Sequence, residues 1–254
     1  MAGQLVKIYK ISIDIYTNSK FKFQVAVLTY TPDFARTNTQ FGGSLISSKH
    51  ILTSAWNVHI PNDYFVYLGD TILGNDMDVG DIKTIAVIKK DIPTCFGSDP
   101  PYPCNIAILE MAESVPLDQY PNIKPVCLPS PGADFTGSTV TVTGWGDDAR
   151  NGVDDFNSWL HEVQLTDYTR QRCNGIPNYQ ICAGVLVGIE APCWGDDGAP
   201  LVVNDPANNN GLTIAGITFY RDGNCQGLET YTKVSYFVNW INGIIGDTTC
   251  PPPP

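Results

Sequence analysis

Cysteines are the residues of this 254-residue chain whose type and spacing point most directly to a chemistry. Their count is eight, and no two of them form the Cys-x-x-Cys pair that structural zinc sites generally use. The spacing therefore predicts disulfide bonds and no metal site. Because disulfides persist in oxidising compartments, we expect a secreted, extracellular protein, although residues 1–4 open no apolar signal segment. The cysteines are Cys95, Cys104, Cys127, Cys173, Cys182, Cys193, Cys225 and Cys250.

Histidines are the second group that could do chemistry, because their charge changes near neutral pH. The chain has three of them, His50, His59 and His161, and none is next to a plausible serine nucleophile. We therefore interpret all three as surface or strand-end residues rather than as general bases. We also expect no cofactor.

Charge and composition exclude several classes of protein. Fifteen basic and 26 acidic residues give a net charge of −11, which repels nucleic-acid phosphates and anionic lipids. No run approaches the roughly 18 apolar residues of a membrane helix. Because 43% of the residues are apolar, the chain can bury a large core. We expect a folded protein that binds neither nucleic acid nor membrane.

The elements that must position these residues are short strands. Apolar and polar residues alternate in runs separated by Gly, Pro, Asn and Asp, which is typical of an all-β barrel or sandwich. Alternate apolar residues from Phe21 to Val27 share one face of the first predicted strand. Residues 116–131 are rich in proline and indicate a linker between two halves, while spacings of three and four predict a helix over 234–245. The other predicted strands cover residues 41–48, 50–54, 64–68, 82–89, 105–111, 138–144, 159–165, 179–183, 200–204, 212–219 and 228–233.

Five segments together resemble the trypsin/chymotrypsin family of serine proteases. They are residues 41–47, 51–56, 105–109, 142–146 and 193–201, in the family's order and at its separations. The resemblance implies an all-β fold of two six-stranded antiparallel β-barrels with a C-terminal α-helix. It also implies one trypsin-like domain over residues 1–254. Within it the first barrel covers about 11–115, the linker about 116–131, the second barrel and helix about 132–246, and a tail 247–254.

The same resemblance implies that all three catalytic residues of the family are replaced. In that family a serine attacks the carbonyl, a histidine takes its proton and an aspartate orients the histidine. The matching positions here hold Trp56 for the histidine, Asn105 for the aspartate and Asp197 for the serine. Indole can only donate a hydrogen bond, and an amide carries no charge. We therefore expect no proteolytic activity.

Asp196 is retained from the family pattern, in which its carboxylate receives the new N-terminal ammonium group after zymogen cleavage. Lys10-Ile11 lies about where that cleavage would occur. The usual pair of glycines after the isoleucine is missing, and Ile13 and Asp14 occupy that region. Because β-branched Ile resists the conformations that Gly permits, we favour an uncut chain in which local backbone donors satisfy Asp196.

The specificity pocket implied by the resemblance is also altered. Ala191 stands where trypsin-like enzymes keep an aspartate, and Phe219-Tyr220-Arg221 replaces the Ser-Trp-Gly wall. Glu229 occupies the place of a pocket glycine. Arg221 and Glu229 could form an ion pair across a closed pocket, or both could point into solvent.

The family pattern also implies disulfide pairings. The family disulfide that flanks the histidine has lost both ends, at Phe41 and Asn57. A small loop between Cys95 and Cys104, and a bond from Cys127 to the C-terminal Cys250, complete the expected set. Two expected pairs match the family, and they are Cys173–Cys182 and Cys193–Cys225.

Three functions are compatible with these features. The first is a secreted, inactive protease homologue that acts by binding a protein partner, as a cofactor, decoy or inhibitor in an extracellular proteolytic cascade of innate immunity. Its partner would be a protease or proenzyme. The second is a hydrolase with rewired chemistry around Asp197, because carboxylates act as nucleophiles in other enzymes. The third is a glycan- or small-molecule-binding protein that uses the altered cleft.

Overall fold

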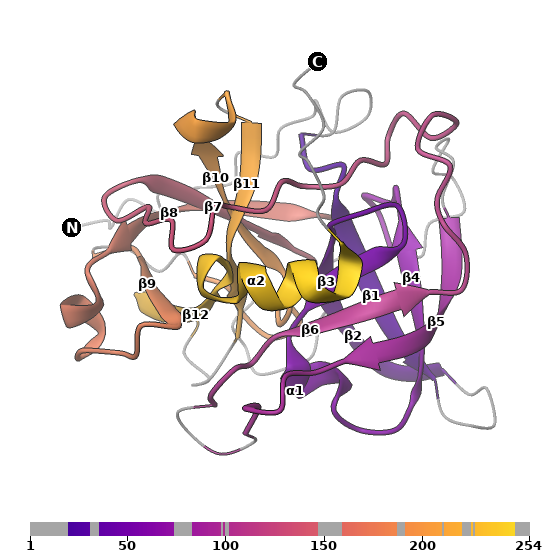
Figure 1. Ribbon diagram of the computed structural model, residues 1–254, viewed down its shortest axis with the longest axis horizontal. Coiled ribbons are helices and arrows are strands. Elements are labelled where there is room, and N and C mark those ends of the chain that lie inside the picture. The colour runs from indigo at the N-terminus through magenta and orange to yellow at the C-terminus, as the bar shows by residue number, and fades with distance from the viewer. Residues whose placement is uncertain are drawn as a thin grey trace, which may run out of the picture.

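Two closed antiparallel β-barrels of six strands each make up the protein, as the sequence predicts. The structure is a computed structural model that describes residues 20–30, 36–73, 83–97, 99, 102–146, 159–186, 191–209, 211–219, 225 and 227–246. In Figure 1 the first barrel, drawn in indigo to magenta, lies beside the second, drawn in pink to orange. None of the helices in these ranges is long and apolar enough to cross a membrane.

The first barrel closes in the strand order β1-β2-β3-β6-β5-β4. Its centre is filled by fully buried aliphatic side chains such as Leu52, Val66 and Ile108, and burial of such side chains is the main term that stabilises the barrel. The strands are β1 (Gln24–Tyr30), β2 (Arg36–Leu45), β3 (His50–Thr53), β4 (Asp63–Leu68), β5 (Lys83–Asp91) and β6 (Ala107–Met111).

The second barrel closes in the order β10-β11-β12-β9-β8-β7. Its core contains Val140, Leu165, Ile181, Leu201 and Tyr231. Two short 3-10 helices, η2 (Arg170–Cys173) and η3 (Pro206–Asn208), lie in its loops. The strands are β7 (Thr139–Gly144), β8 (His161–Tyr168), β9 (Gln180–Gly184), β10 (Pro200–Asp205), β11 (Gly211–Thr218) and β12 (Leu228–Lys233).

Several strand bounds differ from the sequence prediction. For example, β2 covers Arg36–Leu45 rather than 41–48, and β8 covers His161–Tyr168 rather than 159–165. Two of the differences have a clear local cause. Phe21 and Phe23 precede β1, because the hydrogen bond from Gln24 N to Phe21 O (2.9 Å) folds that segment into a turn. Asn105 lies before β6 rather than in it. There the Ile106 N–H bonds to Cys104 O (2.8 Å) and Cys104 has a φ of 53°, so the chain bends tightly just before the strand.

Helix α2 (Val234–Ile245), drawn yellow in Figure 1, joins the two barrels. Phe237 and Ile241 are buried in one core cluster with side chains of both barrels, including Ile108 from β6 and Ile217 from β11. The three-to-four spacing predicted this helix. The four-residue helix α1 (Ala55–Val58) was not predicted, because one turn is too short to show a period.

Three of the predicted disulfide bonds are present in the structure. They are Cys95–Cys104, Cys173–Cys182 and Cys193–Cys225. Cys127 is also disulfide-bonded, and Cys250, the partner that we predict for it, lies outside the described residues.

We expect Cys193→Ser to lower the melting temperature clearly. Cys193 and Cys225 are 2% and 1% exposed, and removal of a native disulfide typically costs about 2–5 kcal/mol. Thermal unfolding followed by circular dichroism measures the change. The double variant Cys193→Ala with Cys225→Ala, which leaves no thiol behind, should show a similar loss. Unchanged melting in both variants would contradict this expectation.

Candidate functional site

The site is built around Trp56 and Asn105, which the structure brings together directly. Asn105 is 3% exposed. Its Oδ1 accepts hydrogen bonds from Trp56 N (2.8 Å) and from Ser54 Oγ (2.9 Å). Thr232 Oγ1 donates to Asn105 O (2.8 Å) and ties this point to the second barrel. Two positions that are 49 residues apart in the sequence are therefore fixed against each other at the join of the barrels.

Asp197 is connected to the same place through the backbone of β2. Gly42 N donates to Asp197 O (2.7 Å), and Gly42 O accepts from Thr53 Oγ1 (2.8 Å), three residues before Trp56. A Cβ atom on Gly42 would lie 2.7 Å from Ala199 N, so only glycine permits this close approach. The backbone therefore holds Asp197 in a fixed relation to α1.

The side chains at these positions provide little proton-transfer chemistry. Indole is a donor only, and the buried Asn105 Nδ2 has no hydrogen-bond partner among the described residues. The amide also has no charge with which to stabilise a protonated neighbour. Of the three, only the half-buried Asp197 carboxylate could accept a proton.

Five rings form what we call the aromatic cluster, made of Trp56, His59, Phe96, Tyr102 and Phe219. The Trp56 ring centroid lies 5.4 Å from that of His59, 5.6 Å from Tyr102 and 6.1 Å from Phe219. Tyr102 and Phe219 are 4.8 Å apart, and His59 and Phe96 are 5.9 Å apart. The three pairs among Trp56, Tyr102 and Phe219 meet edge to face, and each such pair adds about 0.5–1.5 kcal/mol beyond burial.

The side chains of the aromatic cluster differ in their exposure to solvent. Phe219 is 7% exposed, whereas Trp56 is 39% exposed. The disulfide between Cys95 and Cys104 closes the loop that carries Phe96 and Tyr102. Sequence reasoning named Trp56 and Phe219 but missed the two loop aromatics, although the disulfide loop that brackets them was visible as a signal.

A group of polar and aromatic contacts holds the end of α1, near the lost disulfide positions. Lys90 Nζ donates to Val58 O (2.8 Å) and Ile60 O (2.7 Å), and it lies 4.9 Å above the Tyr64 ring. Tyr64 Oη–H also donates to Ile60 O (2.9 Å), and its ring contacts Phe41 edge-on. Burial lowers the pKa of Lys90 and raises the pKa of Tyr64 to about 12.

We expect Lys90→Met to loosen α1. The change removes the lysine donor from Val58 O, which costs about 1–3 kcal/mol, whereas Ile60 O keeps its bonds from Tyr64 Oη and Asn62 N. Amide hydrogen exchange over residues 55–60 should become faster. Lys89→Met is the matched control, because Lys89 is 55% exposed and pairs with Asp91 at 2.8 Å. That control should leave stability nearly unchanged, because exposed ion pairs contribute little. Equal effects of the two variants would contradict the role given to Lys90.

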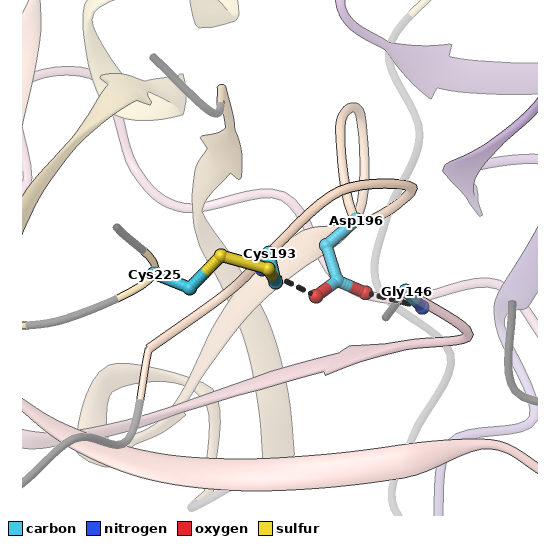
Figure 2. The surroundings of a disulfide bond; sticks show 4 residues. All are labelled: Gly146, Cys193, Asp196 and Cys225. Atoms are coloured by element: carbon cyan, nitrogen blue, oxygen red, sulfur yellow. Dashed lines mark hydrogen bonds between the residues drawn. A yellow bond between two sulfur atoms is a disulfide. The ribbon is translucent and has the colours of Figure 1, made fainter. Parts of the chain in front are cut away.

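Asp196 is held by backbone donors, as we predicted (Figure 2). Gly146 N donates to Oδ1 (2.9 Å) and Cys193 N donates to Oδ2 (2.9 Å). A Cβ atom on Gly144 would overlap Oδ1, and one on Gly146 would lie 2.6 Å from Asp196 Cγ. The glycines on both sides of Trp145 therefore make room for this carboxylate. Lys10, Ile11 and the residues beside them lie outside the described residues.

Parts of the expected specificity pocket lie in the described residues and parts do not. Ala191 is half-buried and Phe219 is buried. Glu229 is half-buried in β12, where it pairs with Ala183 of β9. Tyr220 and Arg221 lie outside the described residues, and so does the expected ion pair between Arg221 and Glu229.

All three histidines lie at a strand start or on the surface, as expected, although one of them contacts a serine. His50 Nδ1 lies 2.8 Å from Ser47 Oγ, so this histidine does have a serine beside it. The Ser47 oxygen also accepts bonds from Lys49 N and His50 N, both 3.1 Å, so it closes the turn before β3. Burial lowers the pKa of His50. His59 is exposed beside Trp56, and His161 begins β8.

Comparison with known proteins identifies relatives over most of the chain. The family model described as Trypsin matches residues 13–241. Transmembrane protease serine 11G of Rattus norvegicus is 32% identical over 79% of this chain and 48% of its own length. Melanization protease 1 of Drosophila melanogaster is 31% identical over 85% of this chain and 61% of its own. Coagulation factor XII of Bos taurus is 30% identical over 78% and 35%. The chain thus spans less than two thirds of each of these relatives.

Proposed function

This chain belongs to the trypsin family of serine proteases, and from that premise we propose that it is a secreted member without catalytic activity that acts by binding a protein partner. The observation that carries the proposal is the partly buried hydrogen bond from Trp56 N to Asn105 Oδ1. This hydrogen bond holds the two positions together. The two side chains that would take part in proton transfer, however, are an indole and an amide.

Each replacement removes a step of the family's reaction. Trp56 cannot accept the proton of a nucleophile, and Asn105 cannot stabilise an imidazolium by charge. A carboxylate at Asp197 would place negative charge where a tetrahedral oxyanion develops, which opposes the stabilisation that such sites provide. Loss of the triad costs about 10⁶ in rate in subtilisin. These effects make proteolysis by the family mechanism negligible.

The partner that we propose is a protease or proenzyme of an extracellular cascade of innate immunity. The names of two relatives, Melanization protease 1 and Coagulation factor XII, support a cascade role. The net charge of −11 favours a partner with a basic surface. The chain would act there as a cofactor, decoy or inhibitor. Because screening lengths are about 8 Å at physiological ionic strength, added salt should slow the association.

In this proposal, surface loops outside the former active-site cleft bind the protein partner. A protease fold that has lost its catalytic residues can still serve as a scaffold for binding loops. The aromatic cluster favours a second candidate, in which the cleft itself binds a glycan or a small molecule. Its partly exposed Trp56 ring is the kind of platform that such ligands use.

Substitutions in the cleft separate the two candidates. The measured quantity is the effect of the protein on proteolytic activation in the extracellular fluid of its organism. Trp56→Ala and Tyr220→Ala should leave that effect intact. Trp159→Ala is a matched control for Trp56, since Trp159 is 40% exposed and lies outside the aromatic cluster. If Trp56→Ala abolishes the effect while the fold and the control are unchanged, the cleft is the site and the loop proposal fails.

A further inference from the structure

Strand β8 carries an acidic residue at a position that faces the interior of the second barrel. Alternate residues of a strand share one face, so Asp167 follows Val163 and Leu165 on the same side. Leu165 is buried in the core of the barrel together with Ile181 of β9. Asp167 itself is 4% exposed. A carboxyl group therefore ends an otherwise apolar row.

The Asp167 carboxyl group lines a cavity of about 260 Å³ at this end of the barrel. Among the described residues, no hydrogen bond or ion pair reaches the carboxyl oxygens. Buried carboxyl groups are normally hydrogen-bonded or paired with a positive charge. The other lining residues are mostly polar, and they include Asp134, Thr136, Gln171 and Gln180.

Four titratable or charged groups share the cavity with Asp167. Asp134 accepts hydrogen bonds from Thr136 and lies 3.9 Å from Lys233 Nζ, so this lysine is already shared with another carboxylate. Arg170 and Tyr168 also line the cavity. Burial, and then repulsion from Asp134, raise the pKa of Asp167 to about 7, although Lys233 opposes the shift. The neighbouring cations therefore do not neutralise the negative charge of an ionised Asp167.

We propose that this cavity binds one basic group, a guanidinium or a primary ammonium, whose positive charge pairs with Asp167. The volume accommodates the end of an arginine or lysine side chain, and a guanidinium can bond a carboxylate through two N–H groups. The glutamine and threonine side chains supply oxygen acceptors for the remaining N–H groups. The site stands apart from the proposed function, because none of its lining residues belongs to the aromatic cluster.

Binding and protonation of Asp167 are linked. A bound cation favours the ionised carboxylate, so binding must release protons wherever free Asp167 is partly protonated. With a pKa of about 7 for Asp167, a basic ligand that arrives at neutral pH releases about half a proton. Its affinity rises with pH until Asp167 is fully ionised.

Isothermal titration with Nα-acetyl-arginine methylamide tests the proposal. The probe should bind the wild-type protein, with proton release in buffers of different ionisation enthalpy and tighter binding at about pH 8 than at about pH 6. The citrulline analogue is neutral and similar in shape, and it should bind at least about tenfold more weakly. Asp167→Asn should abolish the proton release and weaken the arginine probe by a similar factor.

Two further arms complete the test. Asp118→Asn, which removes one negative charge from an exposed position outside the cavity, should bind like the wild type. Lys233→Met removes a competing cation and should keep or tighten binding. Butylamine is compared with Nα-acetyl-lysine methylamide, which carries the same primary ammonium group. Equal affinity indicates that a free amine suffices, and weaker affinity of butylamine indicates a side chain in a peptide.

Several results would overturn the proposal. They are equal binding of the citrulline analogue, unchanged binding by Asp167→Asn, and no binding to the wild type at about 10 mM probe, which corresponds to less than about 3 kcal/mol. Binding that appears only in Lys233→Met would show that Lys233 fills the cavity in the native protein, and it would also overturn the proposal.

Discussion

Replacement of Asp167 by asparagine should stabilise the protein, most strongly above neutral pH. The pKa of this carboxyl group is about 7 in the folded state and 3.8 in its ordinary environment. The folded state therefore holds a proton that the unfolded state releases, so wild-type stability falls as the pH rises from about 4 to about 7. A shift of that size corresponds to roughly 4 kcal/mol at full effect. Asparagine is neutral at every pH and avoids this loss.

Urea unfolding at a series of pH values measures the effect. The difference in unfolding free energy between Asp167→Asn and wild type should be small near pH 4 and grow to about 2–4 kcal/mol by pH 8. The exposed Asp118→Asn variant should follow the wild-type pH profile. Parallel profiles for Asp167→Asn and wild type would show that the pKa of Asp167 is not raised in the folded protein, and they would contradict the prediction.

The second large effect concerns attempted repair of the triad. We expect the triple variant Trp56→His, Asn105→Asp and Asp197→Ser to hydrolyse arginine and lysine substrates at least about 10³-fold more slowly than an active family member, because substrate placement contributes factors of that order. Phe219 is buried, with its ring centroid 4.8 Å from that of Tyr102, and it holds the first of the three positions that the resemblance assigns to the substrate wall. Ala191 offers no charge to a basic side chain.

Two measurements on the triple variant separate activation of the introduced serine from the effect of the altered pocket. A fluorophosphonate probe reports whether the serine introduced by Asp197→Ser is activated, independently of the pocket. Steady-state hydrolysis of peptide and ester substrates reports the pocket and the triad together. Labelling with weak turnover is the result expected if the pocket is altered. Turnover that matches trypsin would show that the pocket argument is wrong.

Much of the fold follows from local patterns in the sequence. The strand predictions for residues 138–144 and 200–204 place β7 and β10 almost to the residue, because short apolar and β-branched runs bounded by turn residues are typical of buried strands. The start of β1 could not be placed in this way. Phe21 and Phe23 are apolar and alternate, yet a turn hydrogen bond determines the conformation of their segment. Alternation records burial and cannot distinguish a turn from a strand end.

Some features of the candidate site could also be predicted from the sequence, and others could not. The resemblance implied that Trp56 and Asn105 belong to one site. The missing glycines after Ile11 favoured backbone donors for Asp196, and such donors are observed. The resemblance could not predict the aromatic cluster, in which Trp56, Tyr102 and Phe219 come from three separate segments. The contact of Lys90 with the end of α1 also joins residues about 30 apart in the chain. Such contacts form only when the barrel closes, and they produce no periodic pattern in the sequence.

Asp167 is an informative exception. The pattern of β8, in which Val163, Leu165 and Asp167 alternate with polar residues, already places the acid on the inward face. A carboxyl group at such a position is a reason to look for a ligand or a paired charge. What the sequence could not show is the cavity beside it, because the lining residues come from separate parts of the second barrel.

We propose that this member of the trypsin family has no catalytic serine. The most direct test treats the purified protein with a fluorophosphonate probe and measures hydrolysis of broad peptide and ester panels, with trypsin as the positive control. We predict no labelling of any serine or of Asp197 and no turnover above the buffer rate. Labelling, or turnover that follows the protein through purification and is lost in Asp197→Ala, would contradict the claim.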